Sequence, residues 1–259
     1  MPSFLSITSR ENAVVKSVCA LQSSARERRK TGLFILEGLR ICDDAFANNI
    51  PFEKLIVSKT AEEKYTDTVA RFAENAATCI SVPDSLFAKM SDTDSPQGIL
   101  AVAAVPQVNQ QPDPKGRYIG LENINDPSNL GAVARTAEAL GVSGIFVTGD
   151  GCDPYSPKAL RASMGTLLRV PLFVVKNLID TANAINLKTF ACVVDADAEA
   201  ITKAVFSDGV MLMIGNEANG LKSDTKVRAD YRVTIPMHGK AESLNAAAAA
   251  AIAMWEMVR

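Results

Sequence analysis

The stretch Ile235–Asn245, IPMHGKAESLN, joins a predicted strand to a predicted helix near the end of the 259-residue chain. The preceding segment, Tyr231–Ile235, is rich in β-branched residues, which favours a short strand. The following segment, Leu244–Val258, is rich in alanine and has an apolar helical face made of Leu244, Ala248, Ala251, Trp255 and Val258. Because a helix start carries unpaired N–H groups and the positive end of the helix dipole, the polar loop between them is a candidate ligand site.

Two earlier segments combine a strand, a polar loop and a helix in the same way. Val210–Leu221, VMLMIGNEANGL, begins with an apolar run typical of a strand covered on both faces. Its exit loop has two glycines, which allow a ligand close to the backbone, and the carboxylate of Glu217 between them. Leu121–Gly141, LENINDPSNLGAVARTAEALG, predicts a strand end, a polar turn and a helix whose inward residues are Leu130, Val133, Ala137 and Leu140. Arg135 falls off this apolar stripe, so its side chain should point elsewhere.

The three segments together resemble the SpoU (TrmH-like) branch of the SPOUT RNA methyltransferases. We call them motif 1 (Asn123–Thr136), motif 2 (Gly215–Leu221) and motif 3 (Ile235–Asn245), and they occur in the order found in the family. The matching residues are Asn123, Asp126, Pro127, Asn129, Gly131, Arg135 and Thr136 in motif 1, Gly215, Asn216, Glu217, Gly220 and Leu221 in motif 2, and Ile235, Pro236, Met237, Gly239, Ser243, Leu244 and Asn245 in motif 3.

The resemblance implies an α/β fold whose C-terminal domain is a SPOUT parallel sheet with a deep trefoil knot. It implies methyl transfer from S-adenosylmethionine (AdoMet) to a ribose 2′-hydroxyl of structured RNA, with ribosomal RNA favoured and transfer RNA next. It also implies a homodimer whose active site is completed across the interface. A Rossmann dinucleotide site is disfavoured, because no Gly-x-Gly-x-x-Gly follows the first strand of this domain.

The same resemblance suggests roles for individual residues. The expected catalytic group is Arg135, Asn129, Glu217, Ser243 and Asn245, and the expected cofactor-binding group is Gly215, Asn216, Gly220, Ile235, Met237 and Leu244. Because a guanidinium has a pKa above about 12, we favour a role in which Arg135 binds an RNA phosphate and lowers the pKa of the hydroxyl, although a transiently deprotonated arginine stays open. The competing interpretation of Arg135 is an ion pair with Glu138 or Glu217. For Ile235, Met237 and Leu244, the alternative to cofactor binding is ordinary packing in the core.

The chain is long enough for two domains, and a Pro- and Gln-rich segment separates them. We predict an N-terminal domain at residues 1–105, a linker at 106–116 and a methyltransferase domain at 117–259. In the first domain, strands alternate with helices, which predicts a small α/β sandwich. Its segments FILEGLR (34–40) and TDSPQGILAV (93–102) resemble the ribosomal-protein-like substrate-binding domain of SpoU enzymes.

Basic residues are concentrated near the N-terminus, although the net charge of the whole chain is only −2. A local basic patch can attract phosphates when the whole protein is nearly neutral. The predicted RNA-binding residues are Arg26, Arg28, Arg29, Lys30 and Arg161, and the alternative for the first four is a solvated helix face.

Composition excludes several other classes of function. The chain has one histidine and five widely spaced cysteines without a Cys-x-x-Cys pair, so neither a zinc site nor a disulfide framework is expected. The proposed reaction needs no metal. No apolar run approaches the roughly 20 residues of a membrane span, and no signal pattern opens the chain, so we expect a cytoplasmic protein.

Two other functions remain open at this point. A non-catalytic RNA-binding protein could keep the same fold, although the intact catalytic group argues against it. Methylation of a base instead of the ribose is disfavoured, because the SpoU motif set is the ribose-directed one.

Overall fold

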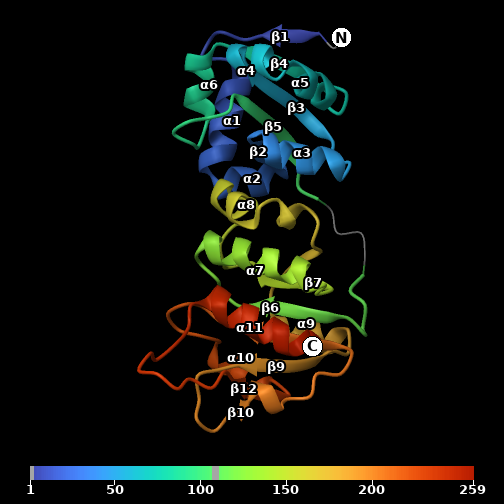
Figure 1. Cartoon of the computed structure of the whole chain (residues 1–259), viewed down its shortest axis with the longest axis vertical. Helices are drawn as coiled ribbons and strands as arrows, with labels where there is room; N and C mark the ends of the chain where they lie inside the picture. Colours follow the sequence, from blue (N-terminus) through green and yellow to red (C-terminus); the bar gives the residue numbers. More distant parts are fainter. Residues whose placement is uncertain (1–2, 107–110) are drawn as a thin grey trace. The chain divides into compact units, whose positions relative to one another are not determined.

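The computed structural model describes residues 3–106 and 111–259. Its Cα positions group into two units, one made of Met1–Gln107 with Tyr155–Arg161 and the other of Val108–Pro154 with Ala162–Arg259 (Figure 1). The linker predicted at residues 106–116 includes 107–110, which lie outside the described residues. Within the described residues, no helix is both long and apolar enough to span a lipid bilayer.

The first unit is built on a five-stranded mixed sheet with the order β1-β4-β3-β5-β2. Strand β4 pairs in parallel with β1 and β3, whereas β5 pairs antiparallel with β2 and β3. The strands are β1 (Phe4–Ser6), β2 (Leu33–Glu37), β3 (Phe52–Ser58), β4 (Cys79–Val82) and β5 (Ile99–Ala104).

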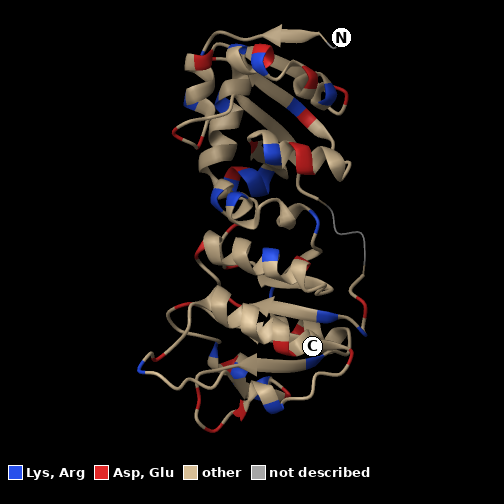
Figure 2. Cartoon of the chain, viewed as in Figure 1, with Lys and Arg blue, Asp and Glu red and all other residues tan. Residues whose placement is uncertain are grey.

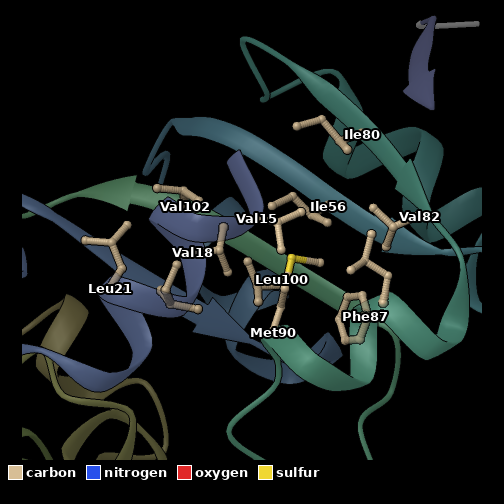
Figure 3. Close-up of a cluster of buried hydrophobic side chains, with 12 residues drawn as sticks. Val15, Val18, Leu21, Ile56, Ile80, Val82, Phe87, Met90, Leu100 and Val102 are labelled. Atoms are coloured by element: carbon tan, nitrogen blue, oxygen red, sulfur yellow. The ribbon is translucent and has the colours of Figure 1, made fainter. Parts of the chain in front are cut away.

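Helices cover this sheet, as the predicted sandwich requires. They are α1 (Ala13–Ser23), α2 (Ala25–Thr31), α3 (Leu39–Ala47), α4 (Lys59–Lys64), α5 (Thr66–Ala73) and α6 (Asp84–Met90). Figure 3 shows α1 and α6 burying Val15, Val18, Leu21, Phe87 and Met90 against the apolar side chains of the sheet. The sequence predicts one continuous helix at residues 61–75, but the structure has two, because the backbone breaks at Tyr65 between α4 and α5.

The second unit contains a seven-stranded sheet with the order β10-β12-β9-β11-β6-β7-β8, and every pair in it is parallel. The strands are β6 (Arg117–Leu121), β7 (Gly144–Thr148), β8 (Leu172–Val175), β9 (Lys188–Cys192), β10 (Glu199–Ala200), β11 (Val210–Ile214) and β12 (Tyr231–Thr234). The sequence predicts six of these strands, at residues 118–122, 144–148, 170–174, 190–194, 210–214 and 231–235, and the two-residue β10 is additional. In an open parallel sheet, ligands bind beyond the carboxyl ends of the strands.

The remaining helices are α7 (Pro127–Ala139), α8 (Pro157–Ser163), α9 (Leu178–Ala184), α10 (Ser223–Arg228) and α11 (Ala246–Val258), with short 3₁₀ turns η1 (Thr166–Leu168) and η2 (Ile201–Lys203). Helices α7 and α11 pack together, and α11 also contacts β6 and β11. Helix α9 packs against β7 and β9, where Leu178 and Ile179 join a core with Tyr118 and Phe146.

Helix α11 does not bury the apolar face read from its sequence. Trp255 is 57% exposed, Leu244 precedes the helix with 38% exposure, and Ala248 is also exposed. The buried face instead carries Ala246, Ala250, Ala253, Met254 and Met257. In a helix that is almost entirely apolar, side-chain polarity alone cannot indicate the core-facing side.

Candidate active site

A cavity of about 470 Å³ opens beyond the carboxyl ends of β9, β11 and β12. All of motif 2 lines it, together with the motif 3 residues Ile235, Met237, Ser243 and Leu244 and the segment 192–195 after β9. Motifs 2 and 3, which the sequence separates, therefore meet at one cavity. The six residues predicted to bind the cofactor all lie in its wall: Gly215, Asn216, Gly220, Ile235, Met237 and Leu244.

The loop of motif 2 is closed on itself. The backbone N–H of Asn216 donates to the Gly220 carbonyl at 3.1 Å, and the N–H of Gly220 donates back to the Asn216 carbonyl at 2.9 Å. The side-chain oxygen of Asn216 also accepts from the N–H groups of Ala218 and Asn219. A Cβ on Gly215 would lie 2.0 Å from the carbonyl carbon of Gly220. Glycine is therefore required at position 215 so that the loop can close.

Glu217 connects motif 2 to motif 1. Its carboxylate accepts hydrogen bonds from the Asn129 side chain at 2.7 Å and from the backbone N–H groups of Asn125 and Asp126 at 3.3 Å. Partial burial raises the pKa of the Glu217 carboxyl, but these donors outweigh burial, and the net pKa is lowered. Glu217 therefore remains an ionised acceptor that holds the turn before α7.

Acid should remove the contribution of Glu217 to stability. Its folded-state pKa lies below the ordinary value of 4.5, so this contribution is complete above the unfolded-state pKa and is lost as the pH falls through the folded-state pKa. We expect Glu217→Gln to lower the free energy of unfolding in urea by about 0.5–1 kcal/mol near neutral pH, a size limited by solvent screening of this exposed side chain. The difference between variant and wild type should shrink as the pH falls below the ordinary carboxyl pKa and through the lowered pKa of Glu217 in the folded state. A difference of equal size at neutral and acidic pH would contradict the role of the charge.

Asn129 extends the network to motif 3. Its side-chain oxygen, in a residue only 7% exposed, accepts from the Asn245 side chain at 3.0 Å. The Asn245 oxygen in turn accepts from the N–H groups of Ala247 and Ala248, which caps the start of α11. The hydrogen-bonded chain Glu217–Asn129–Asn245 thus joins all three motifs, and we call it the amide relay.

Arg135 and Ser243 complete the expected catalytic group but take no part in the amide relay. Ser243 is exposed and lines the cavity. Arg135 is exposed on α7 and does not belong to the cavity wall. Among the described residues, neither of the carboxylates considered as partners of Arg135 pairs with it. Glu138 instead binds Arg169 at 2.8 Å, and Glu217 binds the Asn129 side chain.

The predicted RNA-binding residues differ in their surroundings. Arg26, Arg29 and Lys30 are exposed on α2, which Figure 2 shows as a concentration of basic residues. Arg28 is only 5% exposed, and its guanidinium donates to the carbonyls of Leu21 and Gln22 near the end of α1. This corrects the expectation for Arg28, whose side chain is not available to a phosphate. Arg161 forms an ion pair with Asp92 at 2.8 Å within the first unit.

Several residues at this end of the sheet were not singled out from the sequence. Glu122, the residue after β6, is 3% exposed and binds the segment after motif 2. Asp195 and Arg232 pair at 3.0 Å in the cavity wall, and burial raises the pKa of the neighbouring Cys192 thiol to about 11. In the sequence, only their position near the ends of predicted strands could have indicated these residues.

Within the described chain, no group of three or more side chains is arranged to hold a metal ion.

Comparison with known proteins matches both halves of the chain. Residues 116–255 match the model of the SpoU rRNA Methylase family, and residues 12–101 match the MRM3-like substrate binding domain. The 23S rRNA (uridine(2479)-2′-O)-methyltransferase of Streptomyces viridochromogenes is 29% identical, over 100% of this chain and 93% of that protein. The 23S rRNA (guanosine(2553)-2′-O)-methyltransferase RlmP of Bacillus subtilis is 28% identical, over 97% of this chain and 98% of that protein.

A solved structure of similar fold includes the cofactor. The AdoMet-bound rRNA methyltransferase from Sinorhizobium meliloti superposes with a TM-score of 0.86 and 27% sequence identity, over 98% of this chain and 97% of that one. These matches confirm the predicted α/β fold, with its parallel methyltransferase sheet and N-terminal substrate-binding domain. The family model also spans all three motifs. The chain belongs to the SpoU rRNA methylase family.

Proposed function

We propose that the protein transfers a methyl group from AdoMet to a ribose 2′-hydroxyl of structured RNA, with ribosomal RNA as the favoured substrate and transfer RNA as the second. The observation that carries this proposal is the amide relay, which joins the three motifs beside one cavity. The two relatives described above are named for 2′-O-methylation of different nucleotides, uridine and guanosine. Both names give the ribose 2′-oxygen as the methylated atom, although the bases differ, which supports methylation of the ribose over methylation of the base.

The cavity suits AdoMet in size and chemistry. Its volume of about 470 Å³ lies within the roughly 300–1,000 Å³ of small-ligand sites. Ile235, Met237 and Leu244 would provide apolar walls, and the backbone of motif 2 would provide polar groups. When bound, AdoMet supplies a methyl group on a positively charged sulfur. We further propose that the segments after β11 and β12 form the trefoil knot of the family around this site.

The residues around the cavity would orient the ribose and handle its proton. Asn129 and Asn245 hold fixed amide groups, because each is already bound within the relay. Ser243 would contribute a hydroxyl to bind phosphate or to relay the proton. Arg135 would bind the phosphate next to the target ribose, and its positive charge would favour the ionised form of the hydroxyl.

A homodimer would bring Arg135 to a cavity that it does not line in its own chain. Helices α7 and α11 pack together, and α11 exposes Ile252 (40%) and Trp255 (57%). Exposed large apolar side chains on one helix favour burial against another surface. We propose that this face binds a second copy of the chain and that Arg135 of one protomer serves the cavity of its partner.

The first unit would supply the RNA-binding surface. The proposed organisation is a substrate-binding domain at residues 1–105, a linker at 106–116 and a methyltransferase domain at 117–259, acting in the cytoplasm. Exposed basic residues on α2 support the RNA contact. Arg161 would also contact RNA once its ion pair with Asp92 opens.

Neutralising the exposed basic residues of α2 should weaken RNA binding. The variant Arg26→Ala/Arg29→Ala/Lys30→Ala removes three charges, and each phosphate contact to single-stranded RNA contributes about 0.7 to the slope of log K against log [salt]. We expect the magnitude of this slope to fall by up to about 2, as measured by filter binding over a salt series. AdoMet affinity should not change. A matched control is Lys54→Ala/Lys64→Ala/Arg71→Ala, which removes three charges from other elements of the same unit. An equal loss in this control would contradict a local contact at α2.

Incubation with methyl-labelled AdoMet and unmodified ribosomal or transfer RNA tests the activity itself. Label in RNA, followed by mapping to a nucleotide resistant to alkaline cleavage at its 3′ side, would support ribose methylation. RNA binding without transfer of label would instead support the non-catalytic alternative. Label that is found on the base would contradict the proposed reaction.

A further inference from the structure

Glu122 contacts both ends of the motif 2 loop. Its backbone N–H donates to the carbonyl of Ile214, the residue before the loop, at 2.9 Å. Its carboxylate accepts from the N–H of Lys222, the residue after the loop, at 2.7 Å, and from the Thr225 hydroxyl at 2.6 Å. One residue at the end of β6 therefore fixes the entry and the exit of a loop about a hundred residues further along the chain.

A carboxylate in this position has a high energetic cost unless it is well paired. Glu122 is 3% exposed, and its two donors come from one short segment. Removal of one partner from a buried charged interaction is strongly destabilising locally. Because Gly215 and Gly220 close the loop tightly on itself, displacement of its ends should move the whole loop and not only one residue of it.

We propose that Glu122 is a positioning residue for AdoMet: by holding both ends of the motif 2 loop, it sets the affinity of the cavity for the cofactor. Glu122 does not itself line the cavity. The inference rests on the proposed function, since it assumes that the cavity binds AdoMet. It assigns Glu122 no part in RNA binding or in the chemical step.

The variant Glu122→Gln tests this inference. Glutamine keeps the size of the side chain but loses the negative charge; if its oxygen accepts from the Lys222 N–H, its amide nitrogen can only donate to the Thr225 hydroxyl, which must then reverse its role. We expect the Kd for AdoMet, measured by calorimetry on the full chain, to rise about tenfold with the loss of a charge-assisted bond. The KM for AdoMet should rise in parallel, whereas kcat at saturating AdoMet and the KM for RNA should stay unchanged. Thr225→Val, which keeps the carboxylate and removes one donor, should show a smaller rise.

The same sheet offers a closely matched control. Asp230, just before β12, also accepts from one backbone N–H and one threonine hydroxyl, both of Thr189, at 2.9 and 2.8 Å. It lies at the amino end of its strand and not at the cavity. Asp230→Asn should therefore lower the melting temperature without changing the Kd for AdoMet.

The possible outcomes distinguish a failure of the positioning role of Glu122 from a failure of the proposed function. If wild type binds AdoMet and both Glu122→Gln and Thr225→Val bind it equally well, the positioning role is wrong while the proposed function stands. A rise in Kd for Asp230→Asn equal to that for Glu122→Gln would also overturn it, because the effect would then be general destabilisation. If Glu122→Gln does not fold, Thr225→Val decides. Failure of wild type to bind AdoMet would overturn the proposed function and the inference together.

Discussion

Arg135→Ala should lower kcat for RNA methylation by at least about 100-fold, the effect typical of removing a group that stabilises charge in a transition state. The Kd for AdoMet should not change, because Arg135 does not belong to the cavity wall. Single-turnover methylation and calorimetry on the same preparation measure the two quantities. Unchanged turnover would discard the proposed role of this arginine.

Two further variants test whether the effect depends on the position of Arg135 and on its guanidinium group, or only on the loss of one positive charge. Arg228→Ala removes another arginine of the same unit, which pairs with Asp224 at 3.0 Å and does not line the cavity. It should retain full activity. Arg135→Lys keeps the charge but loses the planar, multidentate guanidinium, so we expect it to recover only part of the lost rate.

Gly215→Ala should weaken AdoMet binding by up to about 100-fold. The added Cβ would lie 2.0 Å from both the Gly220 carbonyl carbon and the Leu221 nitrogen, and backbone atoms cannot rotate away as a side chain can. Relief of such a clash costs about 1–3 kcal/mol, equivalent to a loss of up to about 100-fold in affinity if the loop opens. Calorimetric titration with AdoMet provides the measurement.

A second glycine of the family motifs serves as the control for this prediction. Gly239 lies in motif 3, and a Cβ there would meet nothing within 4 Å. Gly239→Ala should therefore bind AdoMet as wild type does. Equal losses in the two variants would show that the effect does not arise from the closure of the motif 2 loop.

The two impaired variants together test the proposed sharing of the site between protomers. In a mixed dimer of Arg135→Ala and Gly215→Ala chains, one cavity would have an intact motif 2 and would receive Arg135 from the other chain. At AdoMet concentrations too low for the Gly215→Ala cavity to bind, co-expression should therefore give more activity than either variant alone. No recovery in a confirmed mixed dimer would place Arg135 and the cavity in the same chain.

The strands were the most predictable part of the fold. The sequence predicts strands at residues 33–37, 144–148 and 210–214, and the bounds of β2, β7 and β11 agree with these ranges, because each is an apolar run that ends at a clear change in composition. Strands β1 and β10 were missed, since three and two residues are too short to show a pattern. The break at Tyr65 has no glycine or proline to mark it.

The motif residues of the site were predictable as a group, but their mutual contacts were not. The sequence assigns Glu217, Asn129 and Asn245 to three separate motifs, and only the fold shows that a continuous series of hydrogen bonds joins them. Arg28 lies in a basic run that reads as a solvated surface, yet it turns back onto the end of the preceding helix. Glu122 follows an apolar strand, so its buried pairing depends on a segment that the sequence places far away.

The amide relay has a consequence for the response of the enzyme to pH. Neither Asn129 nor Asn245 gains or loses a proton, and Glu217 is already ionised in mildly acidic solution because its pKa is lowered. Burial raises the pKa of the Cys192 thiol to about 11, so this thiol is protonated near neutral pH. Glu217, Asn129, Asn245 and Cys192 therefore each keep one protonation state from weakly acidic to moderately alkaline solution. If methylation accelerates over that interval, the slope of the pH–rate profile should report on deprotonation of the attacking sugar oxygen and not on reorganisation of these groups.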